Sequence, residues 1–325
     1  MKSFISILDH SPEDFISILH LAARIKKEPE KYAHELDGKI LANLFYESST
    51  RTSLSFQSAM QRLGGSVLGF ATKVGTSADK GESLTDTIHM AVGYSDIVVL
   101  RHPKRGSGKL ASEISSEYNV PVISGGSGSQ THPTQSLLDI YSIWETQNRV
   151  DGLTIGISGD LRYSRTIPSL LQLFNKLSSE QSNIHLFAHD LLKLPDQVRY
   201  EILQEKKLVL IDKPSIEDDI SNLDVLYFTR IQRERFPDDS MYQDVRGAFV
   251  FQESYFERVK PNFTLLHPLP RVDEIGYGVD KSKHAYYFKQ AKNGVFVRMS
   301  LILHLLKSDL VSGLNLPKEL GNFPK

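Results

Sequence analysis

The sequence predicts an α/β protein with two domains, each a parallel sheet flanked by helices, and an active site between them. Short apolar runs alternate with helical patterns along the whole chain, which is typical of parallel sheets covered by helices. With 325 residues the chain is long for a single core, and chains of this length usually divide into domains. Polar clusters follow the expected strands, where such sheets bind ligands. We expect residues 1–134 and 292–325 to form one domain, and residues 135–291 the other.

The composition is that of an ordinary soluble protein and limits its chemistry. Hydrophobic residues make up 40% and charged residues 24%, close to the average for globular chains. The formal net charge of −1 gives no reason to expect nucleic acid or an anionic membrane as a partner. The absence of cysteine excludes disulfides, thiolate metal sites and a cysteine nucleophile, and it fits a reducing compartment. Acidic residues interrupt the short N-terminal apolar run, so we expect no signal peptide, no membrane span and a cytoplasmic location.

The first helix is expected to begin at Pro12. Ser11 is a preferred N-cap residue, proline suits the first helical position, and Glu13 and Asp14 complement the positive end of the helix dipole. Apolar residues then recur at helical spacing up to about Lys27.

The stretch over residues 39–64 predicts a buried strand, a polar turn and an amphipathic helix. The apolar run 40–45 fits a strand covered on both faces. From Leu54 the apolar residues follow helical spacing, and Gly64 supplies a stop. The turn between them, residues 48–52, combines hydroxyls with one arginine at a helix start, which favours an anion site and most naturally a phosphate site. The alternative is an ordinary N-cap, because serine and threonine cap many helices.

The same alternation continues along the rest of the chain. Further strands are expected over residues 66–71, 96–100, 121–124, 153–158, 184–187, 208–211, 225–228 and 264–266. Further helices are expected over residues 82–94, 110–118, 136–145, 167–177, 196–204 and 294–306. Residues 125–129 are rich in glycine and serine, and their composition alone favours a flexible linker.

Six polar clusters follow an expected strand or open an expected helix. They are residues 49–52, 101–103, 132–135, 159–165, 230–232 and 267–271. Scattered surface charge would not respect this placement, so we expect one shared site. Four arginines in the clusters suit a substrate set with several negative charges, although a surface ion pair is the commoner role of any single arginine. They are Arg51, Arg101, Arg165 and Arg230.

The sequence contains no phosphate-binding P-loop, dinucleotide fingerprint, serine-nucleophile elbow or metal-ligand pattern. We therefore expect no cofactor and no metal, and catalysis by positioning and electrostatic stabilisation. His132 is the candidate acid, base or oxyanion donor, with Gln135 one turn later on the same helix face. A lone histidine is more often structural, but the helix dipole at His132 would lower its pKa and keep it a neutral donor.

Six segments in order resemble motifs of the aspartate/ornithine transcarbamoylase family. They are FYESSTRT (45–52), RHP (101–103), HPTQ (132–135), GDLRYSRT (159–166), TRIQ (229–232) and HPLPRVDE (267–274). The resemblance covers nearly the whole chain, and the last two segments are those of the catalytic chains that act on aspartate. The first segment alone does not separate aspartate from ornithine enzymes.

The resemblance implies a carbamoyltransferase of pyrimidine synthesis, with carbamoyl phosphate and L-aspartate as substrates and a role for each matching residue. The phosphate would be held by Ser49, Thr50, Arg51 and Thr52. The carbonyl oxygen would be polarised by Thr52, Arg101 and His132, and the amide placed by Gln135 and the backbone of Pro268 and Leu269. Aspartate would be bound by Arg165 at its α-carboxylate, by Arg230 and Gln232 at its side chain, and by Leu269. Arg162 stands where the family often has lysine.

The resemblance also implies a homotrimer, with or without regulatory chains, in which Ser77 and Lys80 reach the site of a neighbouring subunit. Sequence alone would favour mobile loop residues at these positions. Two alternatives stay open for the function: a transcarbamoylase for another amino acid such as ornithine, and a catalytically silent paralogue that serves as a regulatory subunit.

Overall fold

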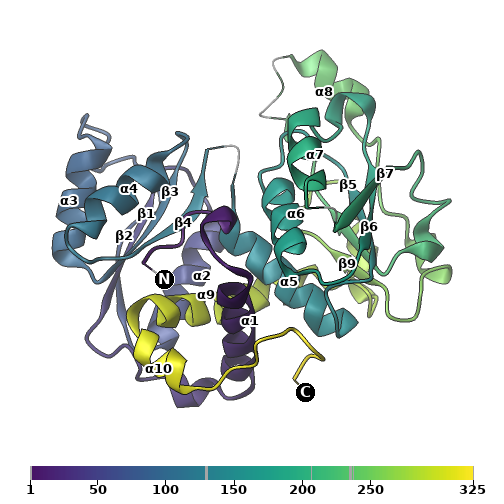
Figure 1. Ribbon diagram of the computed structural model, residues 1–325. Helices are drawn as coiled ribbons and strands as arrows, with labels where there is room; N and C mark the ends of the chain where they lie inside the picture. Colours follow the sequence, from purple (N-terminus) through teal and green to yellow (C-terminus); the bar gives the residue numbers. More distant parts are fainter. Residues whose placement is uncertain (1, 129–130, 206, 234–235, 237, 325) are drawn as a thin grey trace. The chain divides into compact units, whose positions relative to one another are not determined.

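The computed structural model describes residues 2–128, 131–205, 207–233, 236 and 238–324. The chain divides into two compact units (Figure 1). Unit 1 contains residues 1–138, 292–320 and 324, and unit 2 contains residues 139–291 and 321–323. Each unit has its own parallel sheet flanked by helices, so the predicted α/β class with two parallel sheets is confirmed.

Unit 1 is built on a four-stranded sheet in the order β2-β1-β3-β4. Its strands are β1 (Ile40–Phe45), β2 (Ser66–Phe70), β3 (Ile97–His102) and β4 (Val122–Ser127), and every pair is parallel. Its helices are α1 (Pro12–Lys27), α2 (Thr50–Arg62), α3 (Leu84–Tyr94), α4 (Ser107–Ser116) and α10 (Ser308–Gly313), with 3-10 turns η1 (Ile7–Asp9) and η2 (Pro29–Tyr32). The helices α5 (Pro133–Gln147) and α9 (Tyr287–Leu306) each carry the chain from one unit to the other.

Unit 2 is built on a five-stranded parallel sheet in the order β7-β6-β5-β8-β9. Its strands are β5 (Thr154–Ser158), β6 (Ser182–Phe187), β7 (Leu208–Asp212), β8 (Val225–Phe228) and β9 (Thr264–Leu266). Its helices are α6 (Thr166–Leu177), α7 (Asp196–Leu203) and α8 (Asp239–Val245), with 3-10 turns η3 (Asp190–Leu192), η4 (Ile220–Asn222), η6 (Glu253–Glu257) and η7 (Tyr277–Lys281). The strand and helix order agrees with the sequence pattern, while α8 and the 3-10 turns have no clear periodic signal.

Both sheets are buried by apolar side chains on their faces. In unit 1, Ala42, Val98 and Leu100 of the sheet pack with Ile88 of α3 and Ala111 of α4. In unit 2 a second apolar cluster includes Leu226 and Phe228 of β8 and Leu265 of β9. No helix among the described residues combines the length and the hydropathy needed to cross a bilayer.

The glycine- and serine-rich segment after residue 124 is not a linker over its described part. Gly125, Gly126 and Ser127 belong to β4, and the two glycines are buried. A Cβ atom added at Gly125 would lie 3.3 Å from Cζ of Phe45, so the glycine allows close packing. Of the two remaining residues, Gly128 lies in a turn after β4, and Ser129 lies outside the described residues.

The helix expected over residues 294–306 begins earlier, at Tyr287. The expected range is that of the apolar stretch from Gly294 to Leu306. In the structure a Cβ atom at Gly294 would meet Nη1 of Arg298 at 2.4 Å and Cδ2 of Leu138 at 2.9 Å. Close packing inside unit 1 therefore explains this interior glycine.

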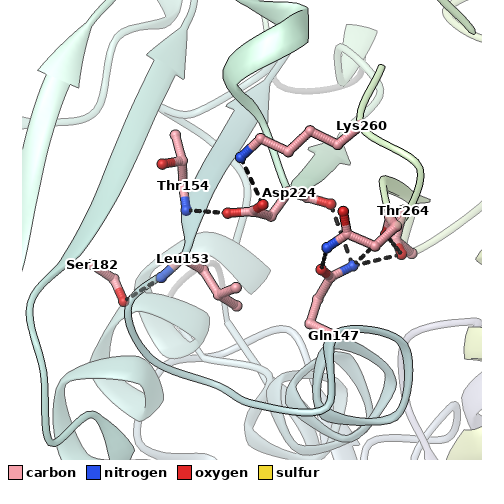
Figure 2. Close-up of polar contacts among 8 residues, drawn as sticks. Gln147, Leu153, Thr154, Ser182, Asp224, Lys260 and Thr264 are labelled. Carbon is pink, nitrogen blue, oxygen red and sulfur yellow. Dashed lines mark hydrogen bonds and ion pairs between the residues drawn. The ribbon is translucent and has the colours of Figure 1, made fainter.

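A polar cluster joins the amino ends of β5, β8 and β9 in unit 2 (Figure 2). Asp224, which precedes β8, accepts hydrogen bonds from Lys260 Nζ at 2.7 Å and from the Thr154 N–H at 2.8 Å. The Gln147 amide of α5 donates to Thr264 Oγ1 at 2.9 Å. We call the set Gln147, Thr154, Asp224, Lys260 and Thr264 the amino-end cluster.

Candidate active site

The expected anion-binding turn is the start of α2 in unit 1. The chain leaves β1 at Phe45 and enters α2 at Thr50, with Ser49 as an extended N-cap residue. The Ser49 hydroxyl makes no capping hydrogen bond with any described residue, so the structure does not support an ordinary side-chain cap. The first N–H groups of a helix have no partner within it, and they carry the positive end of its dipole. This turn therefore has the features of an anion site.

The first turn of α2 is fixed to the sheet through Ser53. The Asn43 amide of β1 donates to Ser53 Oγ at 2.8 Å, and the Gln57 amide donates to the same oxygen at 3.0 Å. Thr52 is buried, whereas Arg51 is exposed. The turn thus presents an exposed guanidinium beside hydroxyls on a fixed helix start.

Arg101 lies near the end of β3, next to β1 in the sheet, and its side chain is held in place. It is only 6% exposed, and burying a charge without a partner is costly. Its guanidinium donates to Glu47 Oε1 at 3.0 Å and to the Gly125 carbonyl at 3.2 Å. Sequence reasoning assigned no role to Glu47; its place within the first motif is the only signal for one.

His132 and Gln135 lie at the start of α5, beyond β4. Both are buried, with exposed fractions of 6% and 9%. The His132 carbonyl accepts from the Gln135 N–H at 3.0 Å and from the Ser136 N–H at 3.2 Å, which begins the helix. The two side chains are one helical turn apart, so they share a face of α5.

The three unit 1 segments follow strands that are neighbours in the sheet. Phe45 of β1 pairs with Arg101 of β3, and β3 pairs in parallel with β4. The carboxyl ends of adjacent parallel strands share one edge of a sheet. The fold of unit 1 therefore gathers at one edge three segments that are far apart in the sequence.

Arg298 of α9 is a buried residue that sequence reasoning missed. Its guanidinium donates to Ser55 Oγ at 2.8 Å and to Thr134 Oγ1 at 3.5 Å, and it lies over the Phe56 ring with 4.9 Å to the ring centre. Arg298 thus ties α9 to the starts of α2 and α5. A charge inside the mostly apolar stretch 294–306 of this helix was the signal available for this role.

Ser77 and Lys80 lie on the loop between β2 and α3, and both are exposed. The Lys80 N–H donates to the Ser77 carbonyl at 3.0 Å, so the two belong to one local turn. Their expected role concerns a neighbouring copy of the chain, and one chain does not test it.

In unit 2 a close approach of two loops follows β5 and β8. Gly159 has φ +106°, and a Cβ atom there would lie 2.0 Å from the Thr229 carbonyl oxygen, so only glycine fits. The Asp160 N–H donates to Thr229 Oγ1 at 3.0 Å. The two loops are therefore joined directly at their roots.

Asp160 organises these loops, a role that the sequence did not suggest. Its carboxylate accepts from the Tyr163 N–H at 2.8 Å and from the Gln232 N–H at 3.4 Å. Burial raises the pKa of Asp160 above its ordinary value, although these N–H groups and the charge of Arg230 act against the shift. A buried carboxylate thus fixes the segment that carries Gln232 relative to the one that carries Arg165.

The residues expected to bind the second substrate lie on these two loops and on the next one. Arg165 occupies the N-cap position of α6, and Arg165, Arg230 and Gln232 are all partly buried. Pro268 and Leu269 follow β9, which pairs with β8. Since β5, β8 and β9 are neighbours, the three loops leave the same edge of the unit 2 sheet. Arg162 points elsewhere and donates to the Leu191 carbonyl at 3.3 Å.

In the described part of the chain, no group of three or more His, Cys, Asp or Glu side chains is arranged to hold a metal ion. The side chains gathered at the two sheet edges are mainly donors, either cationic or neutral. They suit carboxylate, phosphate and carbonyl oxygens.

Comparisons with known proteins agree with this chemistry. Residues 2–145 match the family model described as aspartate/ornithine carbamoyltransferase, carbamoyl-P binding domain, and residues 151–305 match the Asp/Orn binding domain of the same family. The aspartate carbamoyltransferase catalytic subunit of Chromobacterium violaceum is 47% identical over 301 residues, which cover 93% of this chain and 96% of that protein. The corresponding subunit of Thermococcus kodakarensis is 47% identical over 304 residues, with the same coverage.

Solved structures give the same result for the fold. The catalytic subunit of M. jannaschii aspartate transcarbamoylase has a TM-score of 0.86 and 42% identity, over 95% of this chain and 99% of that one. Aspartate transcarbamoylase from Trypanosoma cruzi, solved with carbamoyl phosphate and aspartate, has a TM-score of 0.87 and 35% identity, over 94% of this chain and 97% of that one.

Proposed function

Because the chain belongs to the aspartate/ornithine carbamoyltransferase family, we propose that it transfers the carbamoyl group of carbamoyl phosphate to the amine of L-aspartate. The products are N-carbamoyl-L-aspartate and phosphate, and the reaction is an early step of pyrimidine synthesis. The observation that carries the proposal is the pair of donor sets at the carboxyl edges of the two sheets, one after β1, β3 and β4 and one after β5, β8 and β9.

Unit 1 supplies the carbamoyl-phosphate set in this proposal. The phosphate is bound at the start of α2 by Ser49, Thr50, Arg51 and Thr52. Arg101, His132 and Thr52 polarise the carbonyl oxygen, and Gln135 binds the amide. The bonds from Arg101 to Glu47 and to the Gly125 carbonyl support this assignment, because a fixed donor stabilises developing charge without reorganising.

Unit 2 supplies the aspartate set. Arg165 binds the α-carboxylate, and Arg230 with Gln232 binds the side-chain carboxylate. The Leu269 backbone serves both substrates, and with Pro268 it accepts from the carbamoyl amide. The hydrogen bond from the Gln232 N–H to Asp160 supports a fixed geometry for this set.

The chemistry then needs positioning and charge stabilisation alone. The neutral amine of aspartate attacks the carbonyl carbon, and a tetrahedral intermediate forms with negative charge on oxygen. The donors at that oxygen stabilise the charge. The attacking nitrogen gives one proton to the leaving phosphate oxygen as the C–O bond to phosphate breaks. Phosphate then leaves as the HPO₄²⁻ dianion bound by the α2 start.

Purified chain should be assayed with carbamoyl phosphate and either aspartate or ornithine, following the ureido product. We expect product from aspartate alone, because Arg165 and Arg230 provide two cations for the two carboxylates of aspartate. Product from ornithine alone would show that the acceptor motifs were misassigned. No product from either would favour the catalytically silent paralogue.

The proposed assembly is a cytoplasmic homotrimer in which Ser77 and Lys80 act in the site of a neighbouring copy. The exposure of both residues is compatible with such a role. Chains carrying Lys80→Ala and chains carrying Arg51→Ala, each nearly inactive, should recover activity when mixed, since some hybrid sites contain both native residues. No recovery in demonstrably mixed trimers would count against shared sites.

A further inference from the structure

The loop after β9 holds Leu269 in a backbone conformation that leucine rarely adopts. Its φ is +58°, in the left-handed region where a side chain crowds the following carbonyl oxygen. Residues persist in this region only where the surrounding structure fixes them, and such residues concentrate at functional sites.

His267 provides the contact that fixes Leu269. The Leu269 N–H donates to His267 Nδ1 at 2.8 Å. A backbone N–H can only donate, so Nδ1 must carry a lone pair and the ring proton must be on Nε2. Nε2 lies 2.7 Å from Glu274 Oε1 and donates to it.

Glu274 lies at the C-terminal end of the same loop and forms hydrogen bonds back to it. Its second oxygen accepts from the Val272 N–H at 3.1 Å. Burial alone would raise the pKa of Glu274, but the hydrogen bonds from the His267 ring and from backbone N–H groups outweigh it, so the pKa lies below its ordinary value. The carboxylate is therefore ionised at neutral pH and able to accept both bonds.

The His267 backbone is anchored in the interior of unit 2. Its N–H donates to Gln290 Oε1 at 2.9 Å, and the Gln290 amide donates to Asp139 Oδ1 at 2.6 Å. The Tyr227 hydroxyl of β8 donates to the other Asp139 oxygen at 2.9 Å. None of these four residues is more than 2% exposed, so the support is rigid.

We propose that His267 and Glu274 are positioning residues that hold the carbonyl groups of Pro268 and Leu269 for the amide of the carbamoyl group. They thereby set the preference for a carbamoyl phosphate over an acyl phosphate. The inference rests on the proposed function, in which these carbonyls accept from the amide.

The chemical reason is the difference between an amide and a methyl group. The carbamoyl NH₂ donates two hydrogen bonds, whereas the methyl group of acetyl phosphate donates none. A site built to pair with donors rejects an analogue that lacks them, because its own acceptors stay unpaired. The rejection depends on the acceptors being fixed in direction.

The test compares three probes on the full chain by calorimetry: carbamoyl phosphate, acetyl phosphate and inorganic phosphate. In His267→Phe and Glu274→Gln the ratio of the acetyl phosphate Kd to the carbamoyl phosphate Kd should fall by about tenfold, the worth of one to two ordinary hydrogen bonds. The Kd of inorganic phosphate should not change, because inorganic phosphate has no amide group to pair with these carbonyls. If His267→Phe does not fold, Glu274→Gln carries the test.

Two further variants separate positioning from space filling. His267→Asn keeps a side-chain acceptor for the N–H two residues later, so it should retain more discrimination than His267→Phe. A role in filling space predicts the opposite order. His185→Phe is the matched control, because His185 makes an equally buried pair with Asp219 elsewhere in unit 2, and it should leave the ratio unchanged.

Unchanged discrimination in both His267→Phe and Glu274→Gln would overturn the inference. So would an equal loss of inorganic phosphate binding, or an equal effect of His185→Phe, since either would indicate general destabilisation. A native chain that binds no carbamoyl phosphate would instead refute the proposed function, and the two failures are thus distinguishable.

Discussion

The two ends of the unit 2 sheet both carry charged side chains but use them differently. In the amino-end cluster, Asp224 pairs with Lys260 at 2.7 Å and also accepts from the Thr154 N–H (Figure 2). At the carboxyl end, Asp160 accepts from two backbone N–H groups and so orders the loops of Arg165 and Arg230. At the amino end, the charged side chains pair with each other and with the backbone, and so join strands to loops. At the carboxyl end, the Asp160 carboxylate binds backbone N–H groups, and the arginines lie on the loops at the sheet edge.

This difference explains why polar residues at strand ends do not all indicate a ligand site. The Asp224 carboxylate and the Gln147 amide meet groups of the chain itself, so substitution there should cost stability. The carboxyl-end arginines should matter for the reaction. The following predictions separate these two outcomes, beginning with the largest expected effect.

Arg230→Ala should lower kcat/KM for aspartate by about a thousandfold, because a guanidinium makes two charge-assisted hydrogen bonds to a carboxylate, each worth about 1.5–3 kcal/mol. Steady-state kinetics measures kcat/KM for aspartate, and calorimetry measures the binding of carbamoyl phosphate. Carbamoyl phosphate binding and the unfolding midpoint should stay near those of the native chain. An equal loss of carbamoyl phosphate binding would break the proposed division of roles.

Asp224→Ala should have the opposite profile. Removing one partner of a buried ion pair typically costs about 3 kcal/mol of unfolding free energy, and here it also leaves the Thr154 N–H without its acceptor. Urea denaturation measures the loss, while kcat of the folded protein should be retained. Asp190→Ala is the control, because Asp190 pairs with Lys193 on the surface at 85% exposure and should change little. Lost activity at native stability would contradict the structural role.

Acidification should weaken unit 1 before unit 2. Burial is the main cause that lowers the pKa of three unit 1 histidines, His20, His102 and His304, below the ordinary value near 6.5. These neutral histidines contribute fully to the free energy of unfolding above that value. The contribution is lost as the pH falls from the ordinary value through the lower pKa of the folded state. In unit 2 Asp219 and Glu274 have lowered pKa values, because bonds from His185 and His267 outweigh burial. Their contributions are lost only below the ordinary carboxyl values near 3.8 and 4.5.

Asp160 acts in the reverse direction, since its raised pKa contributes stability at low pH that is lost as pH rises. Over one pH unit a single group changes the unfolding free energy by at most about 1.4 kcal/mol. Hydrogen exchange, corrected for intrinsic rates, should therefore show unit 1 losing protection first between pH 7 and pH 5. Earlier loss in unit 2 would contradict this assignment.

Thr264→Val should have the smallest effect, about 1 kcal/mol or less of unfolding free energy. The substitution keeps the shape and removes one acceptor of the Gln147 amide, which still donates to the Asn262 carbonyl at 2.8 Å. Chemical denaturation measures the change in unfolding free energy. The kinetic constants kcat and KM should stay unchanged. A larger loss would indicate that the amino-end cluster acts as one cooperative network.

The sequence by itself determined the features that depend on local pattern. Apolar periodicity located the strands and helices, and the Ser11 to Asp14 capping box starts α1 as expected. The rule that ligands lie beyond the carboxyl ends of parallel strands selected the segments that contain the candidate residues other than Ser77 and Lys80. Those two came from the family resemblance alone, and all the individual roles remain predictions.

Only the tertiary structure decided what depends on neighbours distant in the sequence. It placed the glycines after Ser124 inside β4, because Phe45 lies against Gly125. It paired Arg298 with Ser55, 243 positions away along the chain. It also set Leu269 at a positive φ, supported by His267. A local pattern reports propensity, whereas these features arise from close packing and hydrogen bonding between separate elements.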